Sequence, residues 1–379
     1  MKIGIIGSGA MGSGIAQVAS QSGHYVILID QSQSALDKSA VQLSETMSKL
    51  TAKGKLTKED AELIQSRIIR NTNIESLSDS DLVIEAIVEN LEVKKELFGK
   101  LDQIVKGSCV LASNTSSLSI TAIASSSKTA SRVMGIHFFN PAPLMPLVEI
   151  IPALQTDASL VAKMQSLITS WGKTVVIAKD TPGFIVNRLA RPFYGEALRI
   201  YEEGIASISL IDIAMREHGG FKMGPFELMD LIGNDVNYAV TETVFRTMYY
   251  DPRYRPSITQ LKMTEAGWLG RKSGKGYYDY NSPETHHADR NPTLEKLVFD
   301  RILVMLINEA YEALHLGIAS SNDLDISMIK GVNYPKGLLQ WGIEIGLNNV
   351  ATKLDELYRY YGEDRYRCSP GIRKAISNV

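Results

Sequence analysis

The pair of residues best suited to acid–base chemistry in this chain is a histidine and a glutamate twelve positions apart. His137 ends one apolar, extended segment and Glu149 lies inside the next, both within residues 135–151. The three prolines between them exclude a helix and predict a turn between two strands. Two strands joined in this way can place an imidazole beside a carboxylate, which fixes the tautomer and supports the protonated ring. The alternative is a core histidine beside an unrelated acid.

The first thirty residues predict a dinucleotide site. Residues 2–6 are short and β-branched, as expected of a buried strand, and Gly7-Ser-Gly9-Ala-Met-Gly12 follows at once, before a helical pattern. Gly7 would make the tight turn, Gly9 would let the backbone approach a pyrophosphate, and Gly12 would let helix and strand pack closely. The N–H groups and the dipole of the helix N-terminus would then bind the phosphates.

An acid after the next strand specifies the cofactor. Residues 25–29 read as a strand that ends in Asp30, which lies 18 residues past Gly12. A carboxylate there would bond the adenosine ribose diol and repel a 2′-phosphate, and residues 31–34 contain no Arg or Lys. NAD is therefore preferred over NADP. The alternative is a glycine-rich turn followed by an accidental acid.

Two helical patterns, at about 32–52 and 57–70, are joined at Lys53-Gly-Lys55 and predict a helical hairpin inserted into the βαβ unit. Its basic residues can be a solvated face, or they can hold a phosphate-rich ligand such as coenzyme A, with Lys53 the best candidate. These basic positions are Lys49, Lys53, Lys55, Lys58, Arg67 and Arg70.

Further polar groups follow the next predicted strands, at 81–87 and 109–112. Glu89 and Lys94 lie at the start of a predicted helix, about 91–101, at the carboxyl end of a parallel strand, where cofactors bind in open α/β sheets. The loop 113–117 is Ser-Asn-Thr-Ser-Ser. It can be an N-cap cluster for the following helix, or a set of hydroxyl and amide groups directed at a substrate oxygen, and the residues alone leave both open.

The remainder of the chain is helical. A strand over 173–178 is expected to end the first domain, and Asp180-Thr-Pro182 predicts the start of a long helix, with Asn187 one turn in. Residues 270–278, rich in glycine, form an extended end to this region.

An internal repeat with a constant offset of 113 follows. The matched positions are Arg188 with Arg301, Glu196-Ala197 with Glu309-Ala310, residues 204–206 with 317–319, Asp212-Ile213 with Asp325-Ile326, Met215 with Met328, Gly224 with Gly337, and Gly233 with Gly346. The second copy has Asp300 at the position of Asn187, so we interpret it as structural. The predicted domains are therefore 1–180, 181–280 and a truncated, non-catalytic 293–379, with a linker at 281–292.

Composition narrows the class of protein. The 379 residues are 44% hydrophobic and 22% charged, with a net charge of −2 and a pI near 6.3, so nucleic acid is an unexpected partner. No apolar run approaches the roughly 18 to 20 residues that cross a bilayer, and the chain opens directly into a strand-like segment. Two cysteines, Cys109 and Cys368, are too few for a disulfide framework, which favours a cytoplasmic protein. His286-His287 has no further ligand cluster nearby, so no metal site is predicted.

Taken together, these motifs resemble the 3-hydroxyacyl-CoA dehydrogenase family, in its 3-hydroxybutyryl-CoA dehydrogenase-like form. The resemblance spans residues 1 to about 280 and includes the linked motifs at 7–12, 85–90, 113–117, 137–141, 147–149 and 180–188. It implies a Rossmann-type α/β domain, bound NAD, an acyl-CoA substrate and no membrane. The tandem helical copies are similar to those of the larger family members, which implies two repeated all-α domains after the Rossmann domain. The chain would then be a monomer with an intrachain pseudo-dimer, or a homodimer.

The resemblance also assigns roles to residues. His137 resembles the catalytic base and Glu149 the acid that orients it, while Ser116 and Asn187 match the groups that bond the reacting oxygens. The matched cofactor contacts are Gly7, Gly9, Ala10, Met11, Gly12, Asp30, Glu89, Lys94, Asn114, Ser116 and Lys272. The matched coenzyme A and substrate contacts are Lys53, Thr46 (where the family has serine) and Asn140.

The implied reaction is NAD-dependent oxidation of an (S)-3-hydroxyacyl-CoA to the 3-oxoacyl-CoA, reversibly, in fatty-acid or aromatic-acid degradation. Both 3-hydroxybutyryl-CoA and 3-hydroxyadipyl-CoA are possible substrates. Two alternatives are a dehydrogenase of a free 3-hydroxy or sugar acid, which would work without coenzyme A, and a catalytically silent NAD-binding structural protein. The intact set Ser116, His137, Glu149 and Asn187 argues against the silent protein, because a retired site would be free to lose it.

Overall fold

The computed structural model describes residues 1–282 and 290–377, which form two compact units, Met1–Thr181 and Pro182–Val379. Most of the predicted linker at 281–292, with His286 and His287, lies outside the described residues. Within the described part of the chain, no helix combines the length and apolar character needed to span a membrane.

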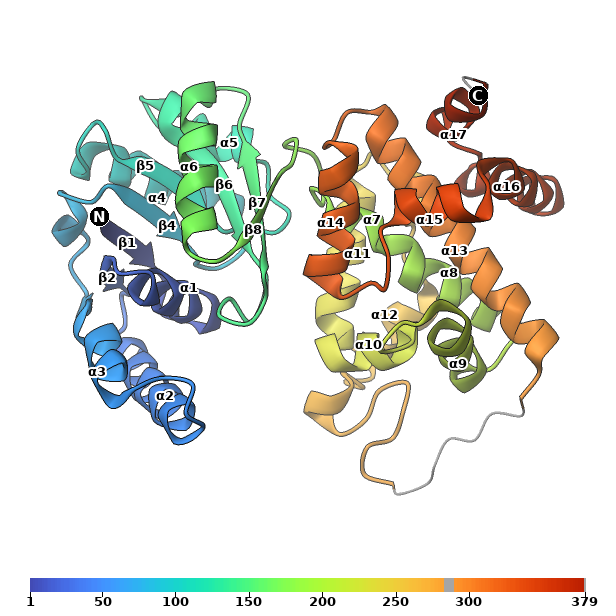
Figure 1. Cartoon of the computed structure of the whole chain (residues 1–379), viewed down its shortest axis with the longest axis horizontal. Coiled ribbons are helices and arrows are strands. Elements are labelled where there is room, and N and C mark those ends of the chain that lie inside the picture. Colours follow the sequence, from blue (N-terminus) through green and yellow to red (C-terminus); the bar gives the residue numbers. More distant parts are fainter. Residues whose placement is uncertain (283–289, 378–379) are drawn as a thin grey trace. The chain divides into compact units, whose positions relative to one another are not determined.

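The N-terminal unit is a Rossmann-type α/β domain built on one eight-stranded sheet (Figure 1). The strand order is β3-β2-β1-β4-β5-β6-β7-β8, and neighbours are parallel except for the antiparallel pair β6 and β7. The strands are β1 (Lys2–Ile6), β2 (Tyr25–Ile29), β3 (Ile68–Asn71), β4 (Leu82–Glu85), β5 (Val110–Ser113), β6 (Val133–Phe138), β7 (Leu147–Pro152) and β8 (Thr174–Ile177). The helices are α1 (Ala10–Gln21), α2 (Gln33–Ala52), α3 (Lys58–Ser66), α4 (Leu91–Ile104), α5 (Ile120–Ala124) and α6 (Ala158–Ser170).

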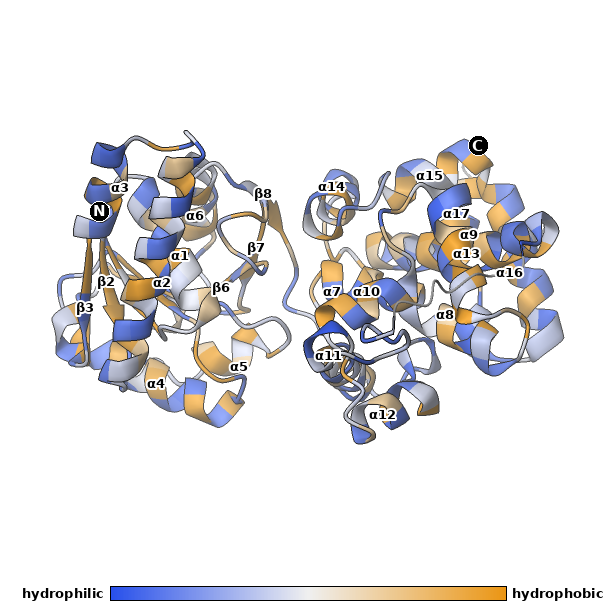
Figure 2. Ribbon diagram, turned by 90° about the horizontal axis from the view of Figure 1, so that it is seen from below, coloured by the Kyte–Doolittle hydropathy of each residue, from blue (hydrophilic) through white to orange (hydrophobic). Residues whose placement is uncertain are grey.

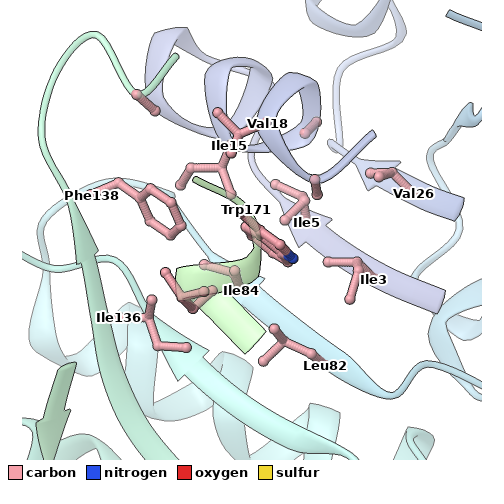
Figure 3. Close-up of a cluster of buried hydrophobic side chains, with 14 of the residues drawn as sticks. Ile3, Ile5, Ile15, Val18, Val26, Leu82, Ile84, Ile136, Phe138 and Trp171 are labelled. Atoms are coloured by element: carbon pink, nitrogen blue, oxygen red, sulfur yellow. The ribbon is translucent and has the colours of Figure 1, made fainter. Parts of the chain in front are cut away.

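One face of this sheet packs against α1, α2 and α6 in a continuous apolar core (Figure 3). Ile136 and Phe138 of β6 belong to this core, and the Phe138 ring stacks on Trp171 at 6.2 Å between centroids. Because side chains alternate along a strand, anchoring these two residues on one face directs His137 to the other face. The core therefore fixes the orientation of the candidate base.

Two expected helix boundaries are wrong. The second helix of the hairpin ends at Ser66 rather than near 70, because Ile68–Asn71 pairs in parallel with β2 as an edge strand. The long helix does not start at Asp180: its carboxylate accepts the backbone N–H groups of Ile120 and Thr121, at 3.0 and 2.7 Å, so it caps α5 instead. Asp180 was expected to cap the helix that follows it in the sequence, but it caps a helix about 60 residues earlier.

The regular elements described in the second unit are helices (Figure 2), and several of them recur at a constant offset along the sequence. The first copy contains α7 (Val186–Leu189), α8 (Arg191–Glu202), α9 (Ile208–Gly219), α10 (Pro225–Ile232), α11 (Asn234–Thr247) and α12 (Ile258–Glu265). The second contains α13 (Pro292–His315), α14 (Ser321–Val332), α15 (Leu338–Ile345), α16 (Leu347–Tyr361) and α17 (Pro370–Ser377). The bounds of α14 and α15 are those of α9 and α10 shifted by 113, and α17 is α12 shifted by 112.

The repeat extends to individual hydrogen bonds. Asp212 accepts the backbone N–H groups of Phe226 and Glu227, and Asp325 accepts those of Leu339 and Gln340, all four positions related by 113. In both copies an aspartate of one helix thus caps the short helix that follows it, and Asp212 of the first copy is buried.

The two copies meet through exchanged ion pairs. Arg188 Nε lies 2.6 Å from Glu309 Oε1, and Arg301 Nε lies 2.6 Å from Glu196 Oε1, so each copy's arginine pairs with the other copy's glutamate. The hydroxyl of Tyr254 donates to Glu309 and that of Tyr366 to Glu196, both at 2.6 Å. These contacts have the reciprocity of a twofold-symmetric dimer interface within one chain.

Candidate active site

His137 and Glu149 are direct partners across the antiparallel pair β6–β7. Their backbones are in register, and His137 Nδ1 lies 2.7 Å from Glu149 Oε2. The side chains are 7% and 1% exposed. The predicted turn is therefore confirmed, and the carboxylate fixes the ring so that Nδ1 carries the proton directed at Glu149. In the neutral ring the other nitrogen, Nε2, is then a hydrogen-bond acceptor.

The loop after β5 is tied to the histidine strand. The Asn114 side-chain oxygen accepts the backbone N–H of Phe138 at 2.8 Å, and the Asn114 N–H donates to the Glu85 carbonyl oxygen. The polar loop 113–117 is thus held between β4 and β6. The Asn114 side chain therefore has a structural bond to the residue that follows His137.

Glu89 organises the same loop. Its Oε1 accepts from Thr115 Oγ1 at 2.5 Å, from the Ser116 N–H at 3.1 Å and from Ser117 Oγ at 3.2 Å. Burial opposes ionisation of Glu89, but the Lys94 charge and these hydrogen bonds outweigh it and lower its pKa. The carboxylate that positions Ser116 is therefore charged at neutral pH.

Lys94 lies beneath this carboxylate. It is 1% exposed, and its Nζ is 2.5 Å from Glu85 Oε1 and 3.3 Å from Glu89 Oε2. Glu85, which is fully buried, also accepts from Ser113 Oγ at 2.7 Å and from the Ile87 N–H. Lys94 thus orients Glu89 from within the protein. Sequence reasoning missed Glu85, although an acid at the end of a buried strand was a signal for it.

The glycine turn has the geometry that a dinucleotide requires. Gly7 adopts φ 99°, and a Cβ on Gly12 would lie 1.8 Å from the Gly7 carbonyl oxygen. A Cβ on Gly9 would meet no protein atom within 4 Å, so the space at that point is open to a ligand. Ala10 and Met11 follow as the first residues of α1.

Asp30 lies at the carboxyl end of β2 and faces this turn. It accepts the Ser8 N–H at 2.8 Å and the Ser32 N–H at 3.0 Å. Burial works against its ionisation, yet these backbone bonds lower its pKa. Gly7, Gly9 and Asp30 line one pocket of about 670 Å³ with apolar walls that include Ile6 and Ile74. The structure thus brings together the predicted glycines and the predicted ribose acid.

A second pocket, of about 690 Å³, lies between α1, α2 and the proline-rich loop. Ala10, Thr46 and Asn140 line it, so two of the residues assigned to coenzyme A share one pocket. Lys53 is exposed at the C-terminus of α2 and is not among the lining residues, whereas Lys55 is. Both lysines belong to the basic positions of the hairpin, and Lys55 is the one that the structure places at this pocket.

The remaining predicted residues belong to the helical unit. Asn187 lies in α7, in the first copy. Lys272 follows α12 and pairs with Asp235 of α11, with 2.6 Å between Nζ and Oδ1. Within the described ranges, no group of three or more His, Cys, Asp or Glu residues could hold a metal ion.

Comparison with known proteins gives a consistent result over the whole chain. Residues 2–181 match the NAD-binding domain of 3-hydroxyacyl-CoA dehydrogenase, and residues 183–280 and 297–378 each match its C-terminal domain. A 3-hydroxyadipyl-CoA dehydrogenase of Escherichia coli K12 is 39% identical over 99% of this chain and 97% of its own. A 3-hydroxybutyryl-CoA dehydrogenase of Clostridioides difficile is 44% identical, over 74% of this chain and all of its own.

Solved structures agree. The crystal structure of a 3-hydroxybutyryl-CoA dehydrogenase from Escherichia coli K12 has a TM-score of 0.94 and 37% identity, and covers 99% of this chain and 98% of that one. The (S)-3-hydroxybutyryl-CoA dehydrogenase of Ralstonia eutropha has a TM-score of 0.72 and 40% identity, with 74% of this chain covered and 99% of that one. The shorter relatives thus match a part of the chain, while the two from Escherichia coli span both helical copies.

Proposed function

The chain belongs to the 3-hydroxyacyl-CoA dehydrogenase family and is an NAD-dependent oxidoreductase, and we propose that its base is His137. The substrate is an (S)-3-hydroxyacyl-CoA of the 3-hydroxybutyryl or 3-hydroxyadipyl type, converted reversibly to the 3-oxoacyl-CoA. The observation that carries this proposal is the buried contact of 2.7 Å between His137 Nδ1 and Glu149 Oε2.

In this proposal, His137 Nε2 takes the proton of the substrate's C3 hydroxyl, and Glu149 stabilises the imidazolium that forms. A positioned base of this kind typically contributes about 10²–10⁴-fold in rate. Ser116, held by Glu89, and Asn187 donate to the reacting oxygens. Donors to a reacting oxygen accelerate the reaction where their bonds are stronger in the transition state than in the ground state.

The residues of the glycine turn fit NAD. Gly7, Gly9 and Gly12 allow backbone N–H groups of α1 to approach the pyrophosphate. Asp30 accepts hydrogen bonds from the ribose hydroxyls. When bound, the nicotinamide supplies the acceptor for the hydrogen that leaves C3. Glu89, Lys94, Asn114 and Lys272 remain the proposed contacts around the rest of the cofactor.

Coenzyme A is proposed to occupy the pocket of Thr46 and Asn140. A phosphate-rich ligand needs a cation, and Lys55 supplies one from the rim of that pocket, with Lys53 close by in sequence. This pocket favours a thioester over a free 3-hydroxy acid, which would leave it without an occupant.

The direct test is oxidation of NADH that depends on acetoacetyl-CoA, with free acetoacetate as the control. We expect turnover with the thioester and at least about 100-fold less with the free acid. Equal turnover of both would support a free-acid dehydrogenase, and NADH binding without turnover of either would support the silent structural protein.

The exchanged Arg188–Glu309 and Arg301–Glu196 pairs support a proposal for the assembly state. The second helical copy takes the place that a second chain would take in a dimer, so the protein is a monomer with one site. Light scattering coupled to size exclusion should give about 42 kDa, against about 83 kDa for a dimer.

We also propose a cytoplasmic location, since both cysteines are buried free thiols, as in proteins of reducing compartments. Cell fractionation tests it.

A further inference from the structure

Arg191 is unusual among the buried arginines of the described residues. Six arginines there are less than 9% exposed, and five pair with a carboxylate within 4 Å: Arg132, Arg188, Arg199, Arg301 and Arg365. Arg191, at 6% exposure, has no acid within that distance among the same residues. Burial lowers the pKa of its guanidinium, and the groups that oppose this are the phenols of Tyr194 and Tyr334 rather than a carboxylate. A buried cation without a counter-ion is costly and calls for an explanation.

The protein holds this guanidinium in place with neutral groups. Its Nε donates to the Asn187 carbonyl oxygen at 2.9 Å and its Nη1 to Thr241 Oγ1 at 3.0 Å. Its Cζ lies 4.9 Å from the centre of the Tyr194 ring. The direct bond to Asn187 matters most, because Asn187 is the helical unit's proposed contact to the substrate.

Other polar groups near Arg191 have donors without a partner. The Tyr334 hydroxyl and Asn237 Nδ2 are buried and make no hydrogen bond within the described part of the protein. Asn237 belongs to the same network, since its carbonyl oxygen accepts from Thr241 and its Oδ1 from Gln260. Burial raises the pKa of Tyr334, and the positive charge of Arg191 opposes this rise. The Tyr334 hydroxyl and Asn237 Nδ2 are thus hydrogen-bond donors that lie near a cation. An anionic ligand would accept hydrogen bonds from such donors.

The second helical copy is an internal control for this polar set, defined as Arg191, Asn237, Thr241 and Gln260. The equivalent residues, 113 positions on for the first three and 112 for the last, are Val304, Val350, Leu354 and Ile372. All four are buried and apolar. The second copy therefore forms the same arrangement of helices with an apolar side chain at each of these four positions. The fold itself does not require the polar set.

We propose that Arg191, with the Tyr334 hydroxyl and Asn237 Nδ2, binds a carboxylate at the far end of the acyl chain, which makes the enzyme selective for dicarboxylic acyl-CoA substrates. This rests on the proposed function and specifies its substrate class. Arg191 lies four residues past Asn187, a separation of the order of one helical turn, about 5.4 Å. In a six-carbon chain the terminal carboxylate is three carbon–carbon bonds from the hydroxyl carbon, a separation of similar size.

The test compares kcat/KM for two thioesters of equal chain length, (S)-3-hydroxyadipyl-CoA and (S)-3-hydroxyhexanoyl-CoA. We expect the wild-type enzyme to prefer the adipyl thioester. In Arg191→Met the ratio of the two values should fall about 10- to 100-fold, the range for hydrogen bonds to charged groups. In Tyr334→Phe, which removes only a hydroxyl, it should fall about 2- to 10-fold.

Arg199→Met is the matched control, because Arg199 is a buried arginine of the same helix whose partner is Glu196. It should lower the melting temperature and leave the ratio as in the wild type. If Arg191→Met does not fold, the wild-type preference and Tyr334→Phe decide. A wild-type ratio of one or less, or an unchanged ratio in a folded Arg191→Met, would overturn the inference. Turnover of neither thioester by the wild type would instead refute the proposed function.

Discussion

In the first helical copy, positions 191, 237, 241 and 260 are polar and position 187 is an asparagine; in the second, the equivalents are apolar and Asp300 replaces the asparagine. The bounds of α9 and α10 recur in α14 and α15, and the carboxylate caps Asp212 and Asp325 are common to both copies. The residues that the two copies share therefore build the framework, and the residues that differ indicate where substrate chemistry is located. Comparing the two helical copies thus distinguishes the residues that stabilise the fold from those that serve function, within a single chain.

The largest expected effect tests the shared framework. Arg301→Met removes the nearer of the two cations of buried Glu196 and leaves Arg199 at 3.7 Å, and breaking a buried pair costs up to about 3–5 kcal/mol in free energy of unfolding. The mirrored Arg188→Met should cost a similar amount or somewhat less, because Arg301 also bonds Glu203 and two tyrosines. Urea unfolding measures both. Lys296→Met, which removes an exposed pair on the same helix as Arg301, is the control and should cost less than about 1 kcal/mol. A comparable loss in the control would contradict the assigned role of the exchanged pairs.

The next effect separates the copies by function. Asn187→Ala should lower kcat about 10²–10³-fold, the usual result of losing one donor to a developing negative charge. Asp300→Ala, at the equivalent position of the second copy, should leave kcat within about twofold. Steady-state NADH oxidation with a saturating thioester measures both. Similar losses in the two variants would mean that the second copy is not merely structural.

A smaller effect concerns a segment found in the first copy. Asp230 accepts the N–H groups of Tyr277 and Tyr278 and the Tyr280 hydroxyl, and so fastens the extended residues after α12. The equivalent position in the second copy is Ile343, which is 65% exposed. Asp230→Asn should cost about 1–3 kcal/mol. It should also speed amide hydrogen exchange at Tyr277 and Tyr278, and unchanged protection there would show that the segment is held by other contacts.

A further effect depends on pH. Burial raises the pKa of Asp212 to about 7, against an ordinary value of 3.8, although the Tyr278 hydroxyl and two backbone N–H groups oppose the shift. Between these values the folded protein keeps a proton that the unfolded chain has released, so this group's contribution to stability falls as the pH rises from about 4 to about 7. In Asp212→Asn that decline should disappear from urea-unfolding curves at pH 5, 6 and 7. An identical pH profile would rule out Asp212 as its source.

The sequence predicted what local patterns and linked motifs determine. The strands, the glycine turn with Asp30 and the His137–Glu149 pair were predicted because alternation and turn residues fix which side chains share a face. The predicted helix boundaries were wrong where contacts with a distant segment determine the structure. Asp180 caps α5, and Ile68–Asn71 forms the edge strand of the sheet.

Buried networks were beyond sequence reasoning for a related reason. The acid at the end of β4 can be seen in the sequence, but its ion pair with Lys94 cannot, and neither can the lack of an ion pair at Arg191 among the described residues. The repeat did carry part of the signal. An offset of 113 pairs Arg191 with Val304, so the sequence by itself matches a charged residue of the first copy to an apolar residue of the second.

The central claim is that His137, oriented by Glu149, is the base, and the kcat of His137→Gln tests it most directly. With acetoacetyl-CoA and NADH, we predict a loss of about 10²–10⁴-fold, together with an unchanged dissociation constant for NADH measured by fluorescence. Wild-type turnover in this variant would contradict the account.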